Sequence, residues 1–411
     1  MKIKKKLISN FSYLSIIQIA TLLIPFIYYP YIIRKFSLDS YGLVIFIQSI
    51  IMLMSIIVDF GFNIYGTRIA SENAHSKKKL SIIYSSITYI KLLLVLISFL
   101  IFQIFIYFNS KLNENHYLSN ILFFIVLGEA LFSQWLYLGL EKIKYAALIN
   151  LFSRLCMLLI IFIGSCTFIG FYSFPLALVF SSLINGILSL WFVNIKLKLK
   201  FIPVSLNRIK KDIKESYSFL LSRSIGVIIL KLNTYLIGNY IGFAQVTYYD
   251  LAEKLINLAL IPINLLNQVL YPYIARTKNF GITFSTIKYL IVIYLLIYPI
   301  LLLFGEDFII LFAGDDMAKS YTYLLILYFI PLLNIFSYFL GNCALVLIDR
   351  KKDFNNSIYI AAFFYITFIL FMSQFGYVTI STLCWAIVLN AFITSLYRIL
   401  KCIKYKNLLK E

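Results

Sequence analysis

The most restrictive feature of the sequence is a series of long apolar runs separated by short polar segments. Most runs reach about 20 residues, the length of a helix that crosses the hydrocarbon core of a bilayer. Lipid offers no hydrogen-bonding partners, so a helix is the economical way to satisfy the backbone there. The runs also lack the alternation of barrel strands. We therefore expect an all-α membrane protein with about twelve transmembrane helices, near residues 11–33, 41–62, 81–108, 117–138, 143–165, 172–195, 217–238, 248–275, 283–304, 320–347, 356–375 and 378–398.

Composition excludes several other classes of protein. Of the 411 residues, 62% are hydrophobic and 13% are charged, against about 45–50% and 25% in soluble domains. A soluble enzyme, a secreted disulfide scaffold and a disordered chain are therefore excluded. The five cysteines form no CxxC pair and both histidines lie in polar segments, so we expect no metal site. No P-loop or dinucleotide-binding glycine motif is present, and we expect no bound cofactor.

The net charge of +20 is explained by orientation in a membrane. If the N-terminus is cytoplasmic, twenty-eight lysines and arginines fall in the cytoplasmic segments and four fall in the opposite loops. The positive-inside rule then predicts that both termini are cytoplasmic. This interpretation requires membrane lipids as surroundings and no nucleic acid as a partner.

The predicted helices divide into two halves of six. The longest internal connection, about Lys196–Ser216, is basic and separates them. The halves are weakly similar in sequence, since Tyr41-Gly42-Leu43 recurs loosely as Tyr249-Asp250-Leu251. Other short matches between the two halves are separated by a similar number of residues. Parallel repeats of this kind occur in transporters. We expect two pseudo-symmetric six-helix bundles, residues 1–200 and 201–411.

Charged residues inside the predicted spans are the candidate functional residues, because a charge at mid-bilayer is costly. Lys91 either reaches the interface with its long side chain or lines a cavity. Arg154 either pairs with Glu129 or presents its charge to a cavity, and the two roles are compatible. Arg223 and Lys231 lie roughly on one side of the same span, with Arg223 near its inner end. We expect the four cations to bind substrate and Glu129 to serve ion coupling.

Three further carboxylates lie near the ends of spans. Asp250 and Lys254 are spaced to neutralise each other on one helix face, and Glu253 lies beside them. Asp59 is placed to cap a helix or to pair with Arg68. Asp59, Asp250 and Glu253 remain candidates for ion coupling, although a structural role is the simpler interpretation.

The interior charge leans cationic, which suits an anion with a charged head and an apolar tail. In several short motifs, the sequence resembles the Wzx-type polysaccharide flippases of the multidrug/oligosaccharidyl-lipid/polysaccharide exporter superfamily. The resemblance rests on Asn10-Phe11-Ser12-Tyr13-Leu14, Tyr29-Pro30-Tyr31-Ile32, Tyr41-Gly42-Leu43, Asp59-Phe60-Gly61-Phe62 and Thr67-Arg68-Ile69-Ala70.

The resemblance implies a bundle with a central cationic cavity. It implies transfer of undecaprenyl-pyrophosphate-linked repeat units of O-antigen or capsule to the outer leaflet of the bacterial inner membrane, by alternating access. It also implies no enzymatic activity, coupling to an H⁺ or Na⁺ gradient, and a polysaccharide polymerase and a chain-length regulator as further partners.

Three alternatives compete with this interpretation. An ion-coupled multidrug or organic-cation antiporter of the same superfamily would need an acidic cavity. A major-facilitator transporter would carry a Gly-x-x-x-Asp-Arg-x-Gly-Arg motif, which segment Asn63–Leu80 lacks. An O-antigen polymerase would need a large external loop, and no predicted external loop is long.

Overall fold

The computed structural model describes residues 23–167 and 169–409, without the side chains of residues 218, 219 and 221–224. The described residues form helices and connecting segments and contain no strand. Ten helical segments are long and apolar enough to cross a membrane, and they coincide with ten of the predicted spans. The first predicted span begins outside the described residues and is helical over residues 23–35. The predicted all-helical membrane fold is confirmed at this level.

The chain divides into two compact units. Unit 1 contains Met1–Ile32 and Phe46–Val227, and unit 2 contains Ile33–Ile45 and Ile228–Glu411. Two helices, α2 (Leu38–Asp59) and α10 (Leu206–Leu236), contribute residues to both units.

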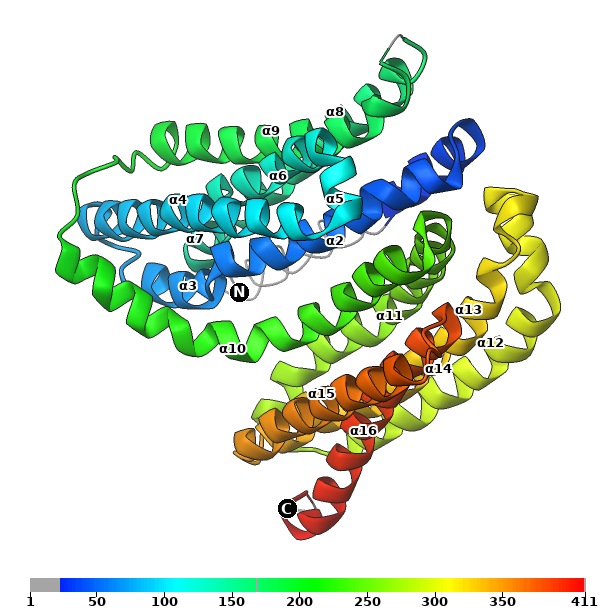
Figure 1. Cartoon of the computed structure of the whole chain (residues 1–411). Coiled ribbons are helices and arrows are strands. Elements are labelled where there is room, and N and C mark those ends of the chain that lie inside the picture. Colours follow the sequence, from blue (N-terminus) through cyan, green and yellow to red (C-terminus); the bar gives the residue numbers. More distant parts are fainter. Residues whose placement is uncertain (1–22, 168, 410–411) are drawn as a thin grey trace. The chain divides into compact units, whose positions relative to one another are not determined.

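Unit 1 is built around two closely packed pairs of helices, α6 with α9 and α8 with α9. Figure 1 shows α4, α6 and α9 running side by side. Along the chain, the short helix α5 connects α4 to α6, and the short helix α7 connects α6 to α8. Its helices after α2 are α3 (Phe62–Glu72), α4 (Lys77–Phe108), α5 (Ser110–Glu114), α6 (His116–Leu131), α7 (Gln134–Gly139), α8 (Ile143–Gly164) and α9 (Ser173–Ile195).

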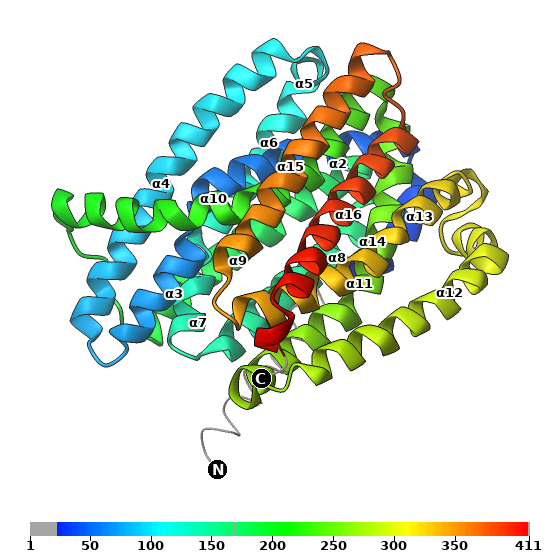
Figure 2. The same ribbon diagram turned by 90° about the horizontal axis from the view of Figure 1, so that it is seen from below.

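Unit 2 contains the remaining long helices. Figure 2 shows α15 and α16 lying side by side, and α16 also packs on α14. Thr379 begins α16 with a capping box, in which its hydroxyl accepts from the backbone N–H of Thr382 at 3.2 Å. The helices are α11 (Phe243–Thr277), α12 (Gly281–Ala313), α13 (Ser320–Leu327), α14 (Phe329–Leu340), α15 (Lys351–Gln374) and α16 (Ile380–Lys404), with π-helical turns at Ile237–Ile241 and Gly341–Val346.

The start of α2 packs against the start of α11 inside unit 2. The Thr247 hydroxyl donates to the carbonyl oxygen of Leu38 at 2.7 Å, and the Tyr41 hydroxyl donates to Asp250 at 2.8 Å. A Cβ on Gly42 would collide with the carbonyl of Phe243, so only glycine permits this approach.

Two predicted boundaries differ from the structure. The predicted fourth span is interrupted, because α6 ends at Leu131 and α7 begins at Gln134. The predicted connection Lys196–Ser216 ends early, because α10 begins at Leu206. Its first turns are polar enough to look like a loop, but Ile209 and Ile213 pack on the core of unit 1.

The crossing of α6 and α9 depends on glycine. A Cβ on Gly128 would overlap the backbone of Ser182, and a Cβ on Gly186 would lie 2.7 Å from the carbonyl oxygen of Gly128. The two backbones therefore approach as closely as small-residue helix interfaces in membranes do.

We expect Gly128→Val to destabilise unit 1 by roughly 1–3 kcal/mol, because overpacking must push α6 away from α9. Thermal unfolding of the purified protein measures the loss. Gly226→Val is the matched control, since its Cβ meets no atom within 4 Å. Equal melting temperatures for the two variants would contradict the close crossing.

Candidate functional site

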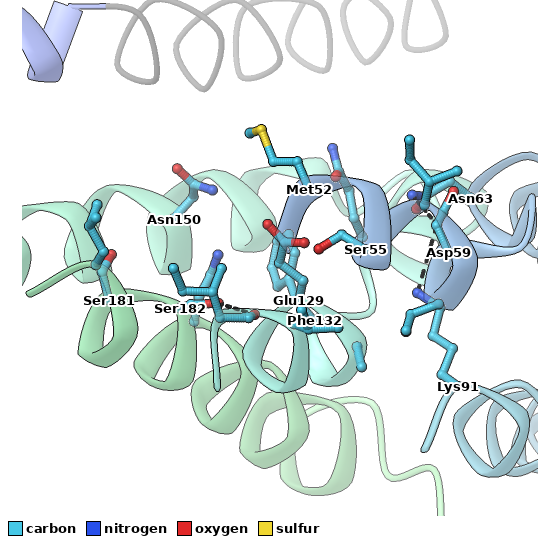
Figure 3. A pocket seen from close by; sticks show the side chains of 18 of the residues that line it. Met52, Ser55, Asp59, Asn63, Lys91, Glu129, Phe132, Asn150, Ser181 and Ser182 are labelled. Carbon is cyan, nitrogen blue, oxygen red and sulfur yellow. Dashed lines mark hydrogen bonds and ion pairs between the residues drawn. The ribbon is translucent and has the colours of Figure 1, made fainter. Parts of the chain in front are cut away.

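A polar cavity of about 490 Å³ lies within unit 1. Its walls come from α2, α6, α8, α9 and α10, from the interruption between α6 and α7, and from Asn63 of α3 and Lys91 of α4. Figure 3 shows the labelled side chains around it. Ligand pockets commonly measure about 300–1,000 Å³, and most are largely apolar. This one is unusual because many of its lining side chains are polar: Gln48, Ser55, Asp59, Asn63, Lys91, Glu129, Gln134, Asn150, Ser153, Arg154, Ser181, Ser182 and Asn185.

Glu129 presents a carboxylate to this cavity from the middle of a candidate membrane span. The residue is exposed although its neighbours Gly128 and Ala130 are buried. Figure 3 shows Glu129 beside Ser55 of α2. Gly128, the residue before Glu129, lies at the close crossing of α6 and α9.

Arg154 lines the same cavity from α8. Its Nε donates to Oδ1 of Asn150, one turn earlier, at 3.0 Å. This bond fixes the side chain while leaving the two terminal guanidinium nitrogens for other partners. Among the described residues, no ion pair joins Arg154 to Glu129 or to another carboxylate. The sequence-based pairing of these two residues is therefore not seen in this part of the chain.

Asp59 and Lys91 form a charged pair in the cavity. Lys91 Nζ lies 3.9 Å from Asp59 Oδ1, and its side chain is only 5% exposed. The Asn63 amide also donates to Asp59 at 2.5 Å. Because Lys91 has a carboxylate beside it and points into the unit, it lines the cavity rather than reaching an interface.

The suggested pairing of Asp59 with Arg68 is wrong. Arg68 instead lies 3.1 Å from Glu215 and 3.8 Å from Glu72. The reason is the turn between α2 and α3, where Phe60 and Gly61 both have positive φ angles. This turn redirects the chain, so α3 does not continue the face on which Asp59 lies.

Unit 2 holds Lys231, Asp250 and Glu253, whereas Arg223 belongs to unit 1. Lys231 Nζ lies 3.1 Å from Glu253 Oε1, and both side chains are largely buried. Asp250 pairs with Lys254, as its spacing predicts, and Lys254 also donates to the Tyr41 hydroxyl at 3.1 Å. The backbone of Arg223 lies in α10, but its side chain is outside the described ones.

The structure thus brings four of the predicted residues into one cavity, namely Asp59, Lys91, Glu129 and Arg154. Their formal charges balance, whereas the sequence suggested a cationic surplus. Sequence reasoning also overlooked the uncharged lining. A search for amides and paired serines within the apolar runs would have found Asn150, Ser181, Ser182 and Asn185.

Two solved structures are similar to this chain in fold. One is described as lipid II flippase MurJ in an inward closed conformation, with a TM-score of 0.74, 16% identity, and coverage of 98% of this chain and 89% of that chain. The other is an inward-facing multidrug resistance MATE family transporter of the MOP superfamily, with a TM-score of 0.69, 14% identity, and coverage of 98% and 99%. At these identities the similarity shows the fold alone.

Sequence comparison identifies closer relatives. A protein of Shigella dysenteriae described as "Putative O-antigen transporter" is 28% identical over 338 residues, which cover 78% of this chain and 82% of the relative. The family model described as polysaccharide biosynthesis protein matches residues 7–278, more than half of the chain. The chain is therefore a multi-pass membrane protein that belongs to the polysaccharide biosynthesis protein family, and the resemblance of its sequence to the polysaccharide flippases is confirmed.

Proposed function

We propose that this protein is a flippase for lipid-linked oligosaccharides. It transfers undecaprenyl-pyrophosphate-linked repeat units of O-antigen or capsule from the cytoplasmic to the periplasmic leaflet of the bacterial inner membrane. The observation that carries the proposal is a polar cavity inside a membrane-spanning unit of a chain whose relative is named as an O-antigen transporter.

The chemistry of the cavity suits a phosphorylated glycan. Moving such a lipid breaks no bond, and the protein needs only to shelter the polar head from the hydrocarbon core. Amide and hydroxyl side chains exchange hydrogen bonds with sugar hydroxyls, and a guanidinium binds phosphate oxygens in pairs. Arg154 is the proposed phosphate contact and Lys91 a second cation. Arg223 and Lys231, both on α10, remain proposed substrate contacts.

Ion coupling forms a separate part of the proposal. Glu129 lines the cavity, and the carboxylate of Asp59 lies 3.9 Å from Lys91 Nζ. Protonation of these carboxylates, or binding of Na⁺ to them, would change the net charge of the cavity in which the substrate binds. Asp250 and Glu253 are secondary candidates, because each already has a lysine partner. The transport cycle needs no cofactor.

The proposed topology completes the model. We propose twelve transmembrane helices in two six-helix bundles, residues 1–200 and 201–411, with both termini in the cytoplasm. The distribution of lysine and arginine supports this orientation. Alternating access would expose the substrate site first to one side and then to the other. A polysaccharide polymerase and a chain-length regulator are the proposed protein partners on the periplasmic side of the membrane.

A drug antiporter is the second candidate function. It is favoured by the similarity of the fold to a MATE family transporter and by the two carboxylates in the cavity. A polymerase-type enzyme has no such support, because the relative of this chain is named as a transporter.

Leaflet transfer in liposomes tests the proposal. The purified protein is reconstituted with a polyprenyl-pyrophosphate oligosaccharide, and an added glycan-modifying enzyme reports how much glycan reaches the outer face. In protein-free liposomes, we expect the enzyme to modify only the half of the glycan lipid that lies in the outer leaflet. In proteoliposomes, we expect the modified fraction to rise above one half. Efflux of an organic cation without glycan transfer would establish the antiporter instead.

A further inference from the structure

The segment that follows α9 places its lysines on one side. Lys196, Lys198 and Lys200 are exposed, whereas Leu197 and Leu199 between them are buried in the core of unit 1. The chain turns here, with helical backbone angles at Lys196 and a positive φ at Lys198, and these turns leave the lysines exposed while the two leucines are buried. Because the candidate membrane span Gly170–Ile195 ends just before this segment, the three lysines lie at a membrane boundary.

Serines in the first turns of α4 hold this segment in place. The hydroxyl of Ser81 accepts from the backbone N–H of Lys200 at 3.2 Å. The hydroxyl of Ser85 accepts from the backbone N–H of Ile202 at 3.0 Å. The lysines are therefore attached to a fixed backbone instead of a free loop.

The start of α10 is fixed to the same turns of α4 by a buried carboxylate. Asp212 is fully buried and accepts from the Ser86 hydroxyl at 2.6 Å. Lys210 and Lys214 lie two residues to either side of Asp212, so they are on the opposite face of the helix. Leu206 and Tyr217, which are 73% and 52% exposed, continue this outer stripe at helical spacing.

The acids of α10 neutralise other cations. Arg208 Nε lies 3.0 Å from Asp212, and Lys211 Nζ lies 3.8 Å from Glu215. In contrast, five lysines form no ion pair with any described residue, and we call these five the basic platform: Lys196, Lys198, Lys200, Lys210 and Lys214.

We propose that the basic platform binds the headgroups of anionic phospholipids at the membrane surface. Clusters of four to eight basic residues next to a membrane span attract such lipids, and each lysine contributes about a fivefold preference near the surface. Exposed apolar groups beside the lysines, Phe201, Leu206 and Tyr217, fit the acyl boundary beneath the headgroups. This site is separate from the cavity and does not depend on the proposed transport activity.

Trp191 provides a local reporter for the part of the basic platform that follows α9. It is 52% exposed and lies on the last turns of α9, just before Lys196. Trp135 is buried, and Trp385 can be replaced by phenylalanine in every sample. The protein is reconstituted with phosphatidylcholine or phosphatidylglycerol carrying brominated chains, which quench tryptophan. Competition between the two lipids then gives the relative affinity beside Trp191.

We expect phosphatidylglycerol to be preferred at least threefold at low ionic strength and the preference to approach one at about 0.5 M salt, where screening is strong. The variant Lys196→Gln/Lys198→Gln/Lys200→Gln, which removes the three lysines that directly follow α9, should lose most of the preference. The control Lys352→Gln/Lys404→Gln/Lys406→Gln removes the same charge from exposed sites of unit 2 and should keep it. Equal quenching by the two lipids in the wild type would overturn the proposal. An equal loss in both variants would overturn it too, because only bulk charge would then matter.

Discussion

Replacement of Arg154 by alanine is expected to slow leaflet transfer of the glycan lipid by roughly 100-fold. A guanidinium donates two parallel hydrogen bonds to phosphate, and bonds to charged groups contribute about 1.5 kcal/mol or more each. Because about 1.4 kcal/mol corresponds to a factor of ten, the loss of both bonds gives the expected change. The liposome assay described above measures the rate.

Two further variants separate recognition of phosphate from general charge. Arg154→Lys keeps the positive charge but not the paired geometry, so its rate should fall between wild type and alanine. Arg276→Ala removes an exposed arginine of unit 2 and should transfer glycan at the wild-type rate. If Arg154→Ala also transferred at that rate while remaining folded, Arg154 would not contact the phosphate.

Replacement of Asp212 by alanine is expected to cost about 3–5 kcal/mol of stability. The carboxylate is fully buried, and it accepts hydrogen bonds from Tyr65 at 2.5 Å and Ser86 at 2.6 Å as well as pairing with Arg208. Removing it leaves two buried hydroxyls and a cation without their acceptor, which is far more costly than losing a surface ion pair. Thermal unfolding of the purified protein measures the effect.

Asp212→Asn and Glu215→Ala are the comparisons for this prediction. Asparagine keeps one carbonyl acceptor, so it should be less destabilising than alanine. Glu215 has a partly exposed side chain and pairs with cations that are more than half exposed. Its loss should cost less than about 1 kcal/mol. A small effect of Asp212→Ala, similar to that of Glu215→Ala, would mean that α10 is held by apolar packing alone.

Hydropathy predicted the helices of this protein well, and the early start of α10 escaped it for a physical reason. Lipid demands long apolar segments, so the spans are visible in the sequence. The beginning of α10 is a polar segment, so its helix cannot be recognised from a long apolar run. Its placement depends on Ile209, Ile213 and one buried carboxylate, and Asp212 looks in the sequence like any other charge in a basic segment.

The candidate site was only partly predictable for a related reason. The cost of a charge in lipid directed attention to Lys91, Glu129 and Arg154, and all three line the cavity. Their neighbours could not be assigned, because partners are set by tertiary packing. Lys91 meets Asp59 across 32 positions of sequence, and Arg68 meets Glu215 across 147. No periodicity in the sequence encodes such distances.

The division of α2 between the two units has a consequence for biosynthesis. Unit 1 is complete once residue 227 has been made. The start of α2, however, bonds to residues 209 positions later, through Leu38 with Thr247 and Tyr41 with Asp250. At about 5–20 residues per second, the ribosome needs about 10–40 s to deliver those partners. During that interval the first turns of α2 must be sheltered by lipid or by the insertion machinery, so one of the earliest segments of the chain finds its partners only after the first half has been made.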